Sequence, residues 1–297
     1  MSAFQKVRGS SWTEIELEQE LQEVVAFTEL EKDLEGSSSY AECFKSTDLR
    51  RTLLGVMIMT GQQFMGIAFI SGYATYFFAL IGYTDAFIIN VILNCCAVAG
   101  SIVSFPLVRY VGRRSIMIVG AAVNCISMML FSAIAQAKPG DPRAAKALIA
   151  FICIYTFSFA ASWGPVGPVL VGEIPSNRLR SKGVACAFAS SWIVALSVAT
   201  SIPYLLSPEY ANLGTKVGFI FGSLTFFVFI ATYLWLPETK DRTLEEIDEM
   251  FLNRVPARKF ASYTCTGEVD GHIVTGALRS ESNAVANKQA VVAIEEA

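Results

Sequence analysis

Six apolar segments, each long enough to cross a membrane, decide what this chain can form. They lie at 52–80, 86–110, 115–135, 147–172, 183–206 and 217–236. A hydrocarbon core of about 30 Å is crossed by roughly 20 helical residues. Backbone polar groups in lipid must bond within their own segment, which favours helices over strands. The sequence therefore predicts an all-α membrane protein with six transmembrane helices and the lipid bilayer as a partner.

The charge content supports the same prediction and excludes other classes. Only 16% of the residues are charged, against about 25% in a typical soluble domain. The net charge of −3 is too small to indicate nucleic-acid binding. His272 is the only histidine and the seven cysteines form no CxxC pair, so no metal or cofactor is expected. We expect no enzyme, because the spans carry no histidine or aspartate cluster and no nucleophile with a base.

Basic residues in the short connections predict the orientation. Those on one side are Lys45, Arg50, Arg51, Arg109, Arg113, Arg114, Arg178, Arg180, Lys182, Lys240 and Arg242. Those on the other side are Lys138, Arg143, Lys146 and Lys216. Cytoplasmic loops carry the excess of Lys and Arg. Both termini are therefore predicted to be cytoplasmic, in an integral protein of the plasma membrane.

The chain divides into four predicted regions. Residues 1–51 are cytoplasmic linker helices, within which 12–35 alternate acidic and apolar positions at helical spacing. Residues 52–237 form the six-helix bundle, and 238–255 form a cytoplasmic segment. Residues 256–297 are polar and weakly periodic, which predicts a disordered cytoplasmic tail.

Polar residues inside the first span are candidates for a binding site. Gln62 and Gln63 are adjacent amides within an apolar run, and lipid cannot satisfy their donors and acceptors. They either face a wet cavity or form hydrogen bonds between helices. Tyr73, near the outer end, is either part of an aromatic belt or a gate residue.

The fourth span is interrupted by glycine and proline, in the sequence SWGPVGPVLVGEIP. Transporter folds place broken helices around a central site, although an ordinary proline kink is also compatible with this pattern. Trp192 lies in the middle of the fifth span, where it either packs between helices or stacks on a sugar ring.

Glu173, at the inner end of the fourth span, is the main charge within the spans. Its candidate partners are Arg113, Arg114 and Arg180. Ionisable residues in membranes are usually paired and functional. Such pairs could lock helices while the cytoplasmic side is closed, and the alternative is that these arginines only set the topology.

Several motifs together resemble the sugar porter family of the major facilitator superfamily. They are QQ followed by Gly66, the RYVGRR loop, GEIPSNRLRSKG and PETKDRTLEEIDEMF. The sequences TGQQFMGIAFISGYATYFF and WGPVGPVLVGEIPSNRLRSK are more similar to those of fungal α-glucoside (maltose-type) permeases than to those of hexose carriers. The resemblance covers about residues 1–252. It implies the C-terminal half of a major facilitator fold, which consists of 3+3 inverted repeats.

The resemblance also implies roles for individual residues. Gln62 and Gln63 would contact sugar hydroxyls, Tyr73 would be an outer-gate aromatic residue, and Trp192 would pack beside the sugar. A cytoplasmic charge network would comprise Arg109, Gly112, Arg113, Arg114, Glu173, Arg180 and Glu238. Hexose carriers have asparagine at Ala68, Ala97, Ser191 and Ala195, and tryptophan at Pro168. We keep Ser191 among the substrate-binding candidates.

The expected function is proton-coupled uptake of an α-glucoside such as maltose by alternating access, in the complete protein. The resemblance implies an N-terminal transporter half that this chain does not contain, so the chain is predicted to be inactive alone. Three alternatives remain: a non-transporting sugar sensor of the same fold, a homodimer of two such halves, and a membrane-embedded enzyme, which lacks support in the motifs.

Overall fold

The computed structural model describes residues 39–72, 86–137, 141–207, 209–265, 268–269 and 272–273. Six stretches are helical, long and apolar enough to cross a membrane, as predicted: Asp48–Gly72, Phe87–Tyr110, Arg113–Ala137, Arg143–Glu173, Arg180–Leu206 and Gly214–Trp235. The helices that form them are α3 (Ser46–Phe64), α5 (Ala86–Tyr110), α6 (Arg113–Ala137), α7 (Pro142–Ala161), α8 (Trp163–Glu173), α9 (Arg180–Leu206) and α10 (Val217–Trp235).

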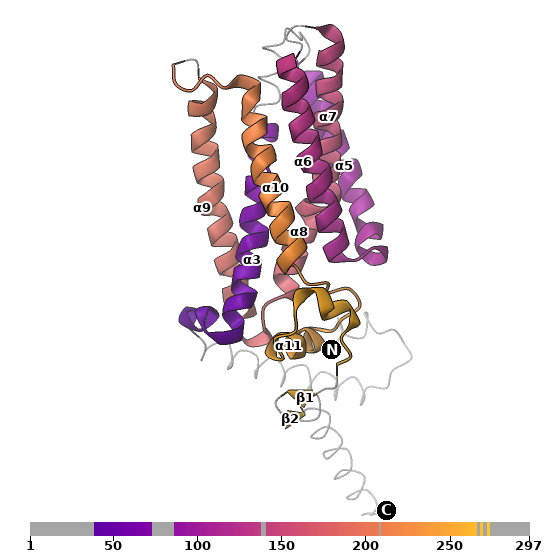
Figure 1. Ribbon diagram of the computed structural model, residues 1–297, viewed down its shortest axis with the longest axis vertical. Coiled ribbons are helices and arrows are strands. Elements are labelled where there is room, and N and C mark those ends of the chain that lie inside the picture. The colour runs from indigo at the N-terminus through magenta and orange to yellow at the C-terminus, as the bar shows by residue number, and fades with distance from the viewer. Residues whose placement is uncertain are drawn as a thin grey trace, which may run out of the picture.

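Smaller elements connect and extend the bundle. They are the 3₁₀ helices η1 (Tyr40–Phe44), η2 (Asn177–Leu179), η3 (Gly214–Lys216) and η4 (Ala257–Ser262), the helix α11 (Leu244–Leu252), and the two short strands β1 (Glu268–Val269) and β2 (His272–Ile273). The two strands pair antiparallel. Figure 1 shows the long helices running roughly along one axis, with α11 and the strands beyond one end of the bundle.

The bundle consists of closely packed helix pairs. The most extensive packing joins α3 to α9, α5 to α7, and α6 to both α10 and α7. In Figure 1, α9 and α5 stand at opposite edges and α8 lies between the two groups. The core therefore lies around α3, α6 and α8, while α5 and α9 leave large apolar side chains exposed, including Phe105 at 79% and Leu196 at 71%.

Trp163, the first residue of α8, is a central core side chain. It is 1% exposed, and its indole Nε1 donates to the carbonyl of Met117 at 2.9 Å. A buried indole N–H needs such a partner. The contact fixes the start of α8 against α6.

The first span is interrupted after α3, which the sequence did not indicate. Gly66 has φ +88, a left-handed conformation that glycine adopts without steric cost. A Cβ at this position would lie 2.8 Å from Cγ of Phe221. The carbonyl of Met65 accepts a hydrogen bond from the hydroxyl of Tyr155 at 2.9 Å, and Ile70 N–H bonds to Gly66 O at 3.1 Å as the helix resumes.

The predicted interruption of the fourth span is present. The chain leaves helical geometry at Ser162, with φ −125 and ψ −86, between α7 and α8. Pro165 and Pro168 follow within two turns. Because proline has no N–H, each leaves a carbonyl four residues earlier without its usual helical partner.

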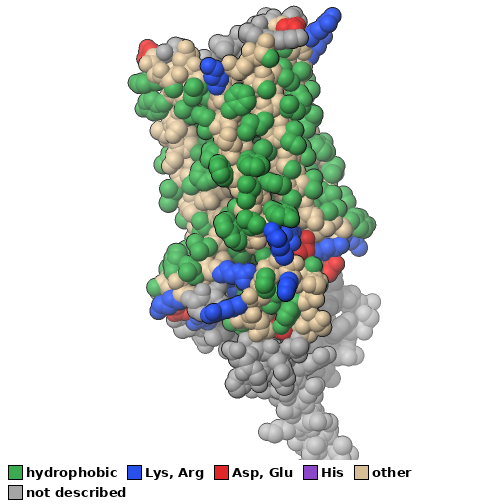
Figure 2. Space-filling view, viewed as in Figure 1, with side chains coloured by type: hydrophobic (Ala, Val, Ile, Leu, Met, Phe, Trp, Pro, Cys, Tyr) green, Lys and Arg blue, Asp and Glu red, His purple; other side chains and the backbone are tan. Residues whose placement is uncertain are grey.

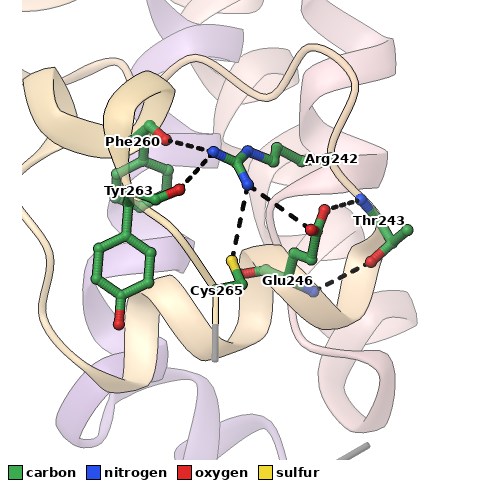
Figure 3. Close-up of polar contacts among 6 residues, drawn as sticks. All are labelled: Arg242, Thr243, Glu246, Phe260, Tyr263 and Cys265. Carbon is green, nitrogen blue, oxygen red and sulfur yellow. Dashed lines mark hydrogen bonds and ion pairs between the residues drawn. The ribbon is translucent and has the colours of Figure 1, made fainter. Parts of the chain in front are cut away.

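The end of the bundle that we predict to be cytoplasmic is closed by α11 and the segment after it. Thr243 and Glu246 form a capping box at the start of α11, which satisfies two helix-end donors. Figure 3 shows Arg242 bonded to the segment that follows α11: its Nη2 donates to Tyr263 O at 2.6 Å and to Phe260 O at 3.3 Å.

The predicted boundary of the disordered tail was wrong. Residues 257–262 form η4, and Phe260 is fully buried with its ring 5.2 Å from that of Phe251. Residues 256–265 contain few large apolar side chains, so the sequence pattern did not indicate that some of them are buried. Of the predicted linker region 1–51, the described residues 39–51 contain η1 and the first turns of α3. Residues 1–38 and those after 273 lie outside the described residues.

Candidate functional site

A cavity lies beside the break in the fourth span. Its volume is about 370 Å³. Its walls come from the resumed first span, α5, α7 and the start of α8. The lining residues are Ile67, Ile70, Ser71, Asn90, Leu93, Asn94, Ala97, Ser101, Thr156, Phe159, Ala160, Gly164 and Pro165.

Polar side chains of α5 form one wall of this cavity. Asn90, Asn94 and Ser101 are four and seven residues apart and therefore share a helix face. The Asn94 amide Nδ2 donates to Asn90 Oδ1 at 2.7 Å and to Asn90 O at 2.9 Å. This wall was missed in the sequence because neither asparagine belongs to a recognised motif. Its signal is the polar spacing within an apolar run.

Thr156 of α7 faces the cavity with an unused hydroxyl. Its side chain is 9% exposed, and its Oγ1 has no hydrogen-bond partner among the described residues. An unsatisfied buried hydroxyl costs about 1–3 kcal/mol. Thr156 lines the cavity, so its buried hydroxyl is a second candidate for contact with a ligand, one that the sequence did not reveal.

Gln62 stabilises the broken fourth span. Its Nε2 lies 3.1 Å from the carbonyl oxygen of Trp163 and 3.5 Å from that of Gly164. Pro168 cannot donate to the Gly164 carbonyl as a regular helix residue would. The glutamine amide therefore bonds mainly to Trp163 O and also lies at the edge of hydrogen-bond distance from the Gly164 carbonyl, at a residue that lines the cavity.

Gln63 and Ser191, both predicted to bind substrate, bind each other. Gln63 Nε2 donates to Ser191 Oγ at 3.1 Å, and Ser191 Oγ donates to Met59 O at 3.1 Å. These bonds join α3 to α9. Both glutamine amides thus serve as hydrogen bonds between helices, one of the two interpretations that their position allowed.

The cavity wall contains none of the predicted substrate-binding residues that the structure describes, which are Gln62, Gln63, Ser191 and Trp192. Trp192 is 73% exposed on α9, and none of the lining residues comes from α9. Its expected position beside a sugar stays a prediction. Tyr73 lies outside the described residues.

The predicted charge network is centred on Glu173, at the end of α8. Its Oε1 accepts from Arg113 Nη2 at 3.1 Å, and its Oε2 accepts from Thr239 Oγ1 at 2.7 Å. The side chains of Arg113 and Glu173 are 21% and 22% exposed. The pair therefore joins the start of α6 to the end of α8 in a partly dehydrated position.

Glu238 caps the start of α6. Its carboxylate accepts from the backbone N–H groups of Arg113 at 2.9 Å and Arg114 at 3.2 Å. A negative charge at a helix N-terminus is favourable because the first N–H groups lack helical partners. Gly112, with φ +97, permits this approach: a Cβ there would lie 2.8 Å from Glu238 Oε2.

The remaining predicted members lie around this cluster. Arg114 Nη2 donates to the carbonyl of Tyr233 at 3.0 Å, linking α6 to α10. Arg109 is exposed, with its guanidinium 6.0 Å from the ring centre of Tyr110. Arg180 is the first residue of α9. The structure thus unites Arg113, Glu173 and Glu238 directly.

Comparisons with known proteins agree with this architecture. The family model described as "Sugar (and other) transporter" matches residues 2–251. The major facilitator-type transporter ecdD of Aspergillus rugulosus is 34% identical over 267 residues, covering 86% of this chain and 49% of that protein. The high-affinity hexose transporter HXT6 of Saccharomyces cerevisiae is 30% identical over 254 residues, covering 82% and 44%.

A sensor and a solved transporter structure are also similar. The high glucose sensor RGT2 of S. cerevisiae is 32% identical over 252 residues, covering 82% of this chain and 33% of the sensor. The proton:xylose symporter XylE, bound to 6-bromo-6-deoxy-D-glucose, superposes with a TM-score of 0.59 at 28% identity, covering 67% of this chain and 42% of that one.

The similar proteins belong to one class of membrane protein. The relatives are transporters and a sensor, not enzymes. They include hexose transporters and a glucose sensor, and none of those named is a maltose-type permease. The chain spans about half of their length or less. Because the family model covers most of the chain, this protein belongs to the sugar transporter family of the major facilitator superfamily.

Proposed function

We propose that this chain supplies one six-helix half of a sugar transport pathway, in a complete protein that moves sugar by alternating access. The observation that carries this proposal is the cavity at the break between α7 and α8, which is lined by both apolar and polar side chains. Transporters bind substrates near the midplane, where discontinuous helices leave backbone groups free. Family membership supports sugar as the substrate class.

The chemistry of the cavity suits a polyhydroxylated ligand. Sugar hydroxyls both donate and accept, and the amides of Asn90 and Asn94 and the hydroxyl of Thr156 offer both functions. Apolar walls such as Phe159 would contact the ring carbons. Gln62 would act indirectly, by holding the carbonyls of Trp163 and Gly164 in place.

The cytoplasmic cluster would control access. We propose that the Arg113–Glu173 pair and the Glu238 cap stabilise the state in which the cytoplasmic side is closed. Opening would separate α6 from α8 and disrupt these contacts. Both contacts lie at the same end of the bundle, where α8 ends and α6 begins.

For the substrate, we propose an α-glucoside such as maltose, moved together with a proton. Small residues stand where hexose carriers have larger polar ones, and one of these, Ala97, lines the cavity. A free hexose is the second candidate, favoured by relatives such as the hexose transporter HXT6. Coupling to a proton is supported by the similarity to XylE, which is a proton:xylose symporter.

A complementary half is required by this mechanism. Rocking of one repeat bundle against another needs two bundles around one site. A homodimer could in principle supply the second bundle, and a glucose sensor of the same fold would bind sugar without moving it, as the similarity to RGT2 suggests.

Uptake measurements separate these possibilities. The chain is produced alone, and together with the N-terminal half of ecdD, in yeast cells that lack their own sugar uptake. We expect labelled maltose to enter only cells making both halves, and a protonophore to abolish uptake. Uptake by the chain alone would favour the homodimer. Uptake of glucose but not maltose would replace the α-glucoside by a hexose, and binding without uptake would indicate a sensor.

A further inference from the structure

A second groove lies far from the cavity, at the end of the bundle that carries α11. It is formed where the start of α3 meets the end of α10 and the residues before η4. Its volume is about 650 Å³. The lining residues are Leu49, Arg50, Leu53, Leu54, Met57, Leu234, Trp235, Pro256 and Ala257.

The groove has an apolar floor that is open to the membrane. Leu53 is 53% exposed and Trp235 is 58% exposed. Both stand in the terminal turns of spans, the level at which tryptophan is enriched between hydrocarbon and headgroups. The shape therefore suits an acyl chain that enters from the side.

One end of the groove is strongly basic. Arg50 lines it and donates to the carbonyl of Val255 at 3.0 Å. The adjoining stretch 253–259 contributes Arg254, Arg258 and Lys259, all exposed, and contains no acidic residue. Arg258 lies 4.8 Å from the ring centre of Tyr233 on α10, which fixes the stretch beside the groove.

Among the described carboxylates, Asp48 and Asp248 pair with Arg51 and not with these cations. Asp48 and Asp248 both contact Arg51, which is 2% exposed, and Asp48 also accepts from Ser176 at 3.2 Å. No acidic side chain lines the groove among the described residues. Figure 2 shows Lys and Arg side chains gathered at the lower end of the hydrophobic surface on the face that carries α10.

From this geometry we propose that the groove binds an anionic phospholipid of the adjacent leaflet. The phosphate and headgroup are held by Arg50 together with the exposed Arg254, Arg258 and Lys259, and one acyl chain lies along Leu53, Met57 and Leu234. Basic pockets between transmembrane helices on the cytoplasmic side are known to bind anionic headgroups. The site is independent of the sugar cavity, so it stands whichever sugar is moved.

The lipid would also have a structural consequence. The groove walls belong to α3, α10 and the start of η4, which are joined at this end by the Arg50–Val255 hydrogen bond and the contact of Arg258 with Tyr233. A lipid seated there bridges all three. Its loss would loosen the segment 253–263 while leaving the remote cavity intact.

Lipid competition tests the proposal. The purified chain is placed in nanodiscs made from equal parts of phosphatidylcholine and phosphatidylserine, and the retained lipids are measured by native mass spectrometry. We expect phosphatidylserine to be retained preferentially. Each cation near the surface contributes about 1 kcal/mol to binding an anionic lipid. The triple variant R254Q/R258Q/K259Q should therefore reduce this preference by roughly tenfold or more.

A matched control uses three exposed cations at the opposite end, in the variant R143Q/K146Q/K216Q, which should keep the native preference. Retention of phosphatidylserine by the groove variant, or equal loss in both variants, would overturn the proposal. A photoreactive residue at Leu53 provides a second measurement: crosslinks to phosphatidylserine support the lipid, and crosslinks to another part of this chain show that protein fills the groove instead.

Discussion

Glu173 allows the proposed cytoplasmic lock to be tested by one substitution. Glu173→Gln preserves the size of the side chain but replaces its carboxylate by a neutral amide. The carboxylate accepts hydrogen bonds from Arg113 at 3.1 Å and from Thr239 at 2.7 Å. Hydrogen bonds to charged groups contribute about 1.5–3 kcal/mol each. The amide still accepts one of the two and the site is partly solvated, so we expect a net loss of about 2 kcal/mol.

Two assays report this loss. In the purified chain, the unfolding midpoint should fall by about 4–8 °C, from the usual scaling for 150–250 residues. When the variant chain is paired with a complementary half, cysteines introduced on its cytoplasmic side should be labelled faster, because the closed state loses these contacts. Glu209→Gln, at an exposed carboxylate near the opposite end, is the control. An unchanged midpoint together with unchanged labelling would refute the lock.

Three further predictions concern the first-span break, the cavity and the C-terminal segment. Gly66→Ala should lower the free energy of unfolding by about 2–4 kcal/mol, because φ at residue 66 is +88 and the new Cβ would lie 2.8 Å from Phe221. Gly72→Ala is the control: a Cβ at residue 72 has no atom within 4 Å, so this change should have little effect in the same denaturation experiment. Thr156→Val removes an unpartnered buried hydroxyl, so stability should be equal or higher while the KM for sugar uptake rises about tenfold; an unchanged KM would remove Thr156 from the site. Burial, and then Glu249 and Glu246, raise the pKa of the Cys265 thiol above its ordinary value of 9.0. Its thiolate is therefore scarce at neutral pH, and the midpoint of the pH profile of its alkylation rate should lie above 9.0; a midpoint below that value would contradict the packing of this segment.

The sequence predicted the six spans because uninterrupted apolar length is a local property. It also predicted the break in the fourth span, where Pro165 and Pro168 remove backbone donors. It did not predict the break at Gly66, because a single glycine in an apolar run gives no distinctive signal. The left-handed turn there depends on Phe221 and Tyr155, which are distant in sequence.

None of the predicted substrate-binding residues that the structure describes lines the cavity, because its walls depend on how helices face one another. Gln62, Gln63 and Ser191 were identified as important polar residues, but their hydrogen-bond partners follow from packing between helices. Asn94 and Thr156 line the cavity without belonging to a motif. Arg113 and Glu173 were predicted as partners because charges near a membrane have few permitted arrangements. Glu238 was predicted only from the resemblance to the sugar porter family.

The most direct test of this account is to locate bound sugar. A photoreactive maltose analogue is crosslinked to the complete transporter, in which this chain is paired with its complementary half, and the labelled peptides are identified by mass spectrometry. The account predicts labelling of the α5 peptide containing Asn94 or the α7–α8 peptide containing Thr156 and Gly164, with loss of labelling in excess unlabelled sugar. Competed labelling confined to other helices, with none on these two peptides, would contradict the cavity as the sugar site.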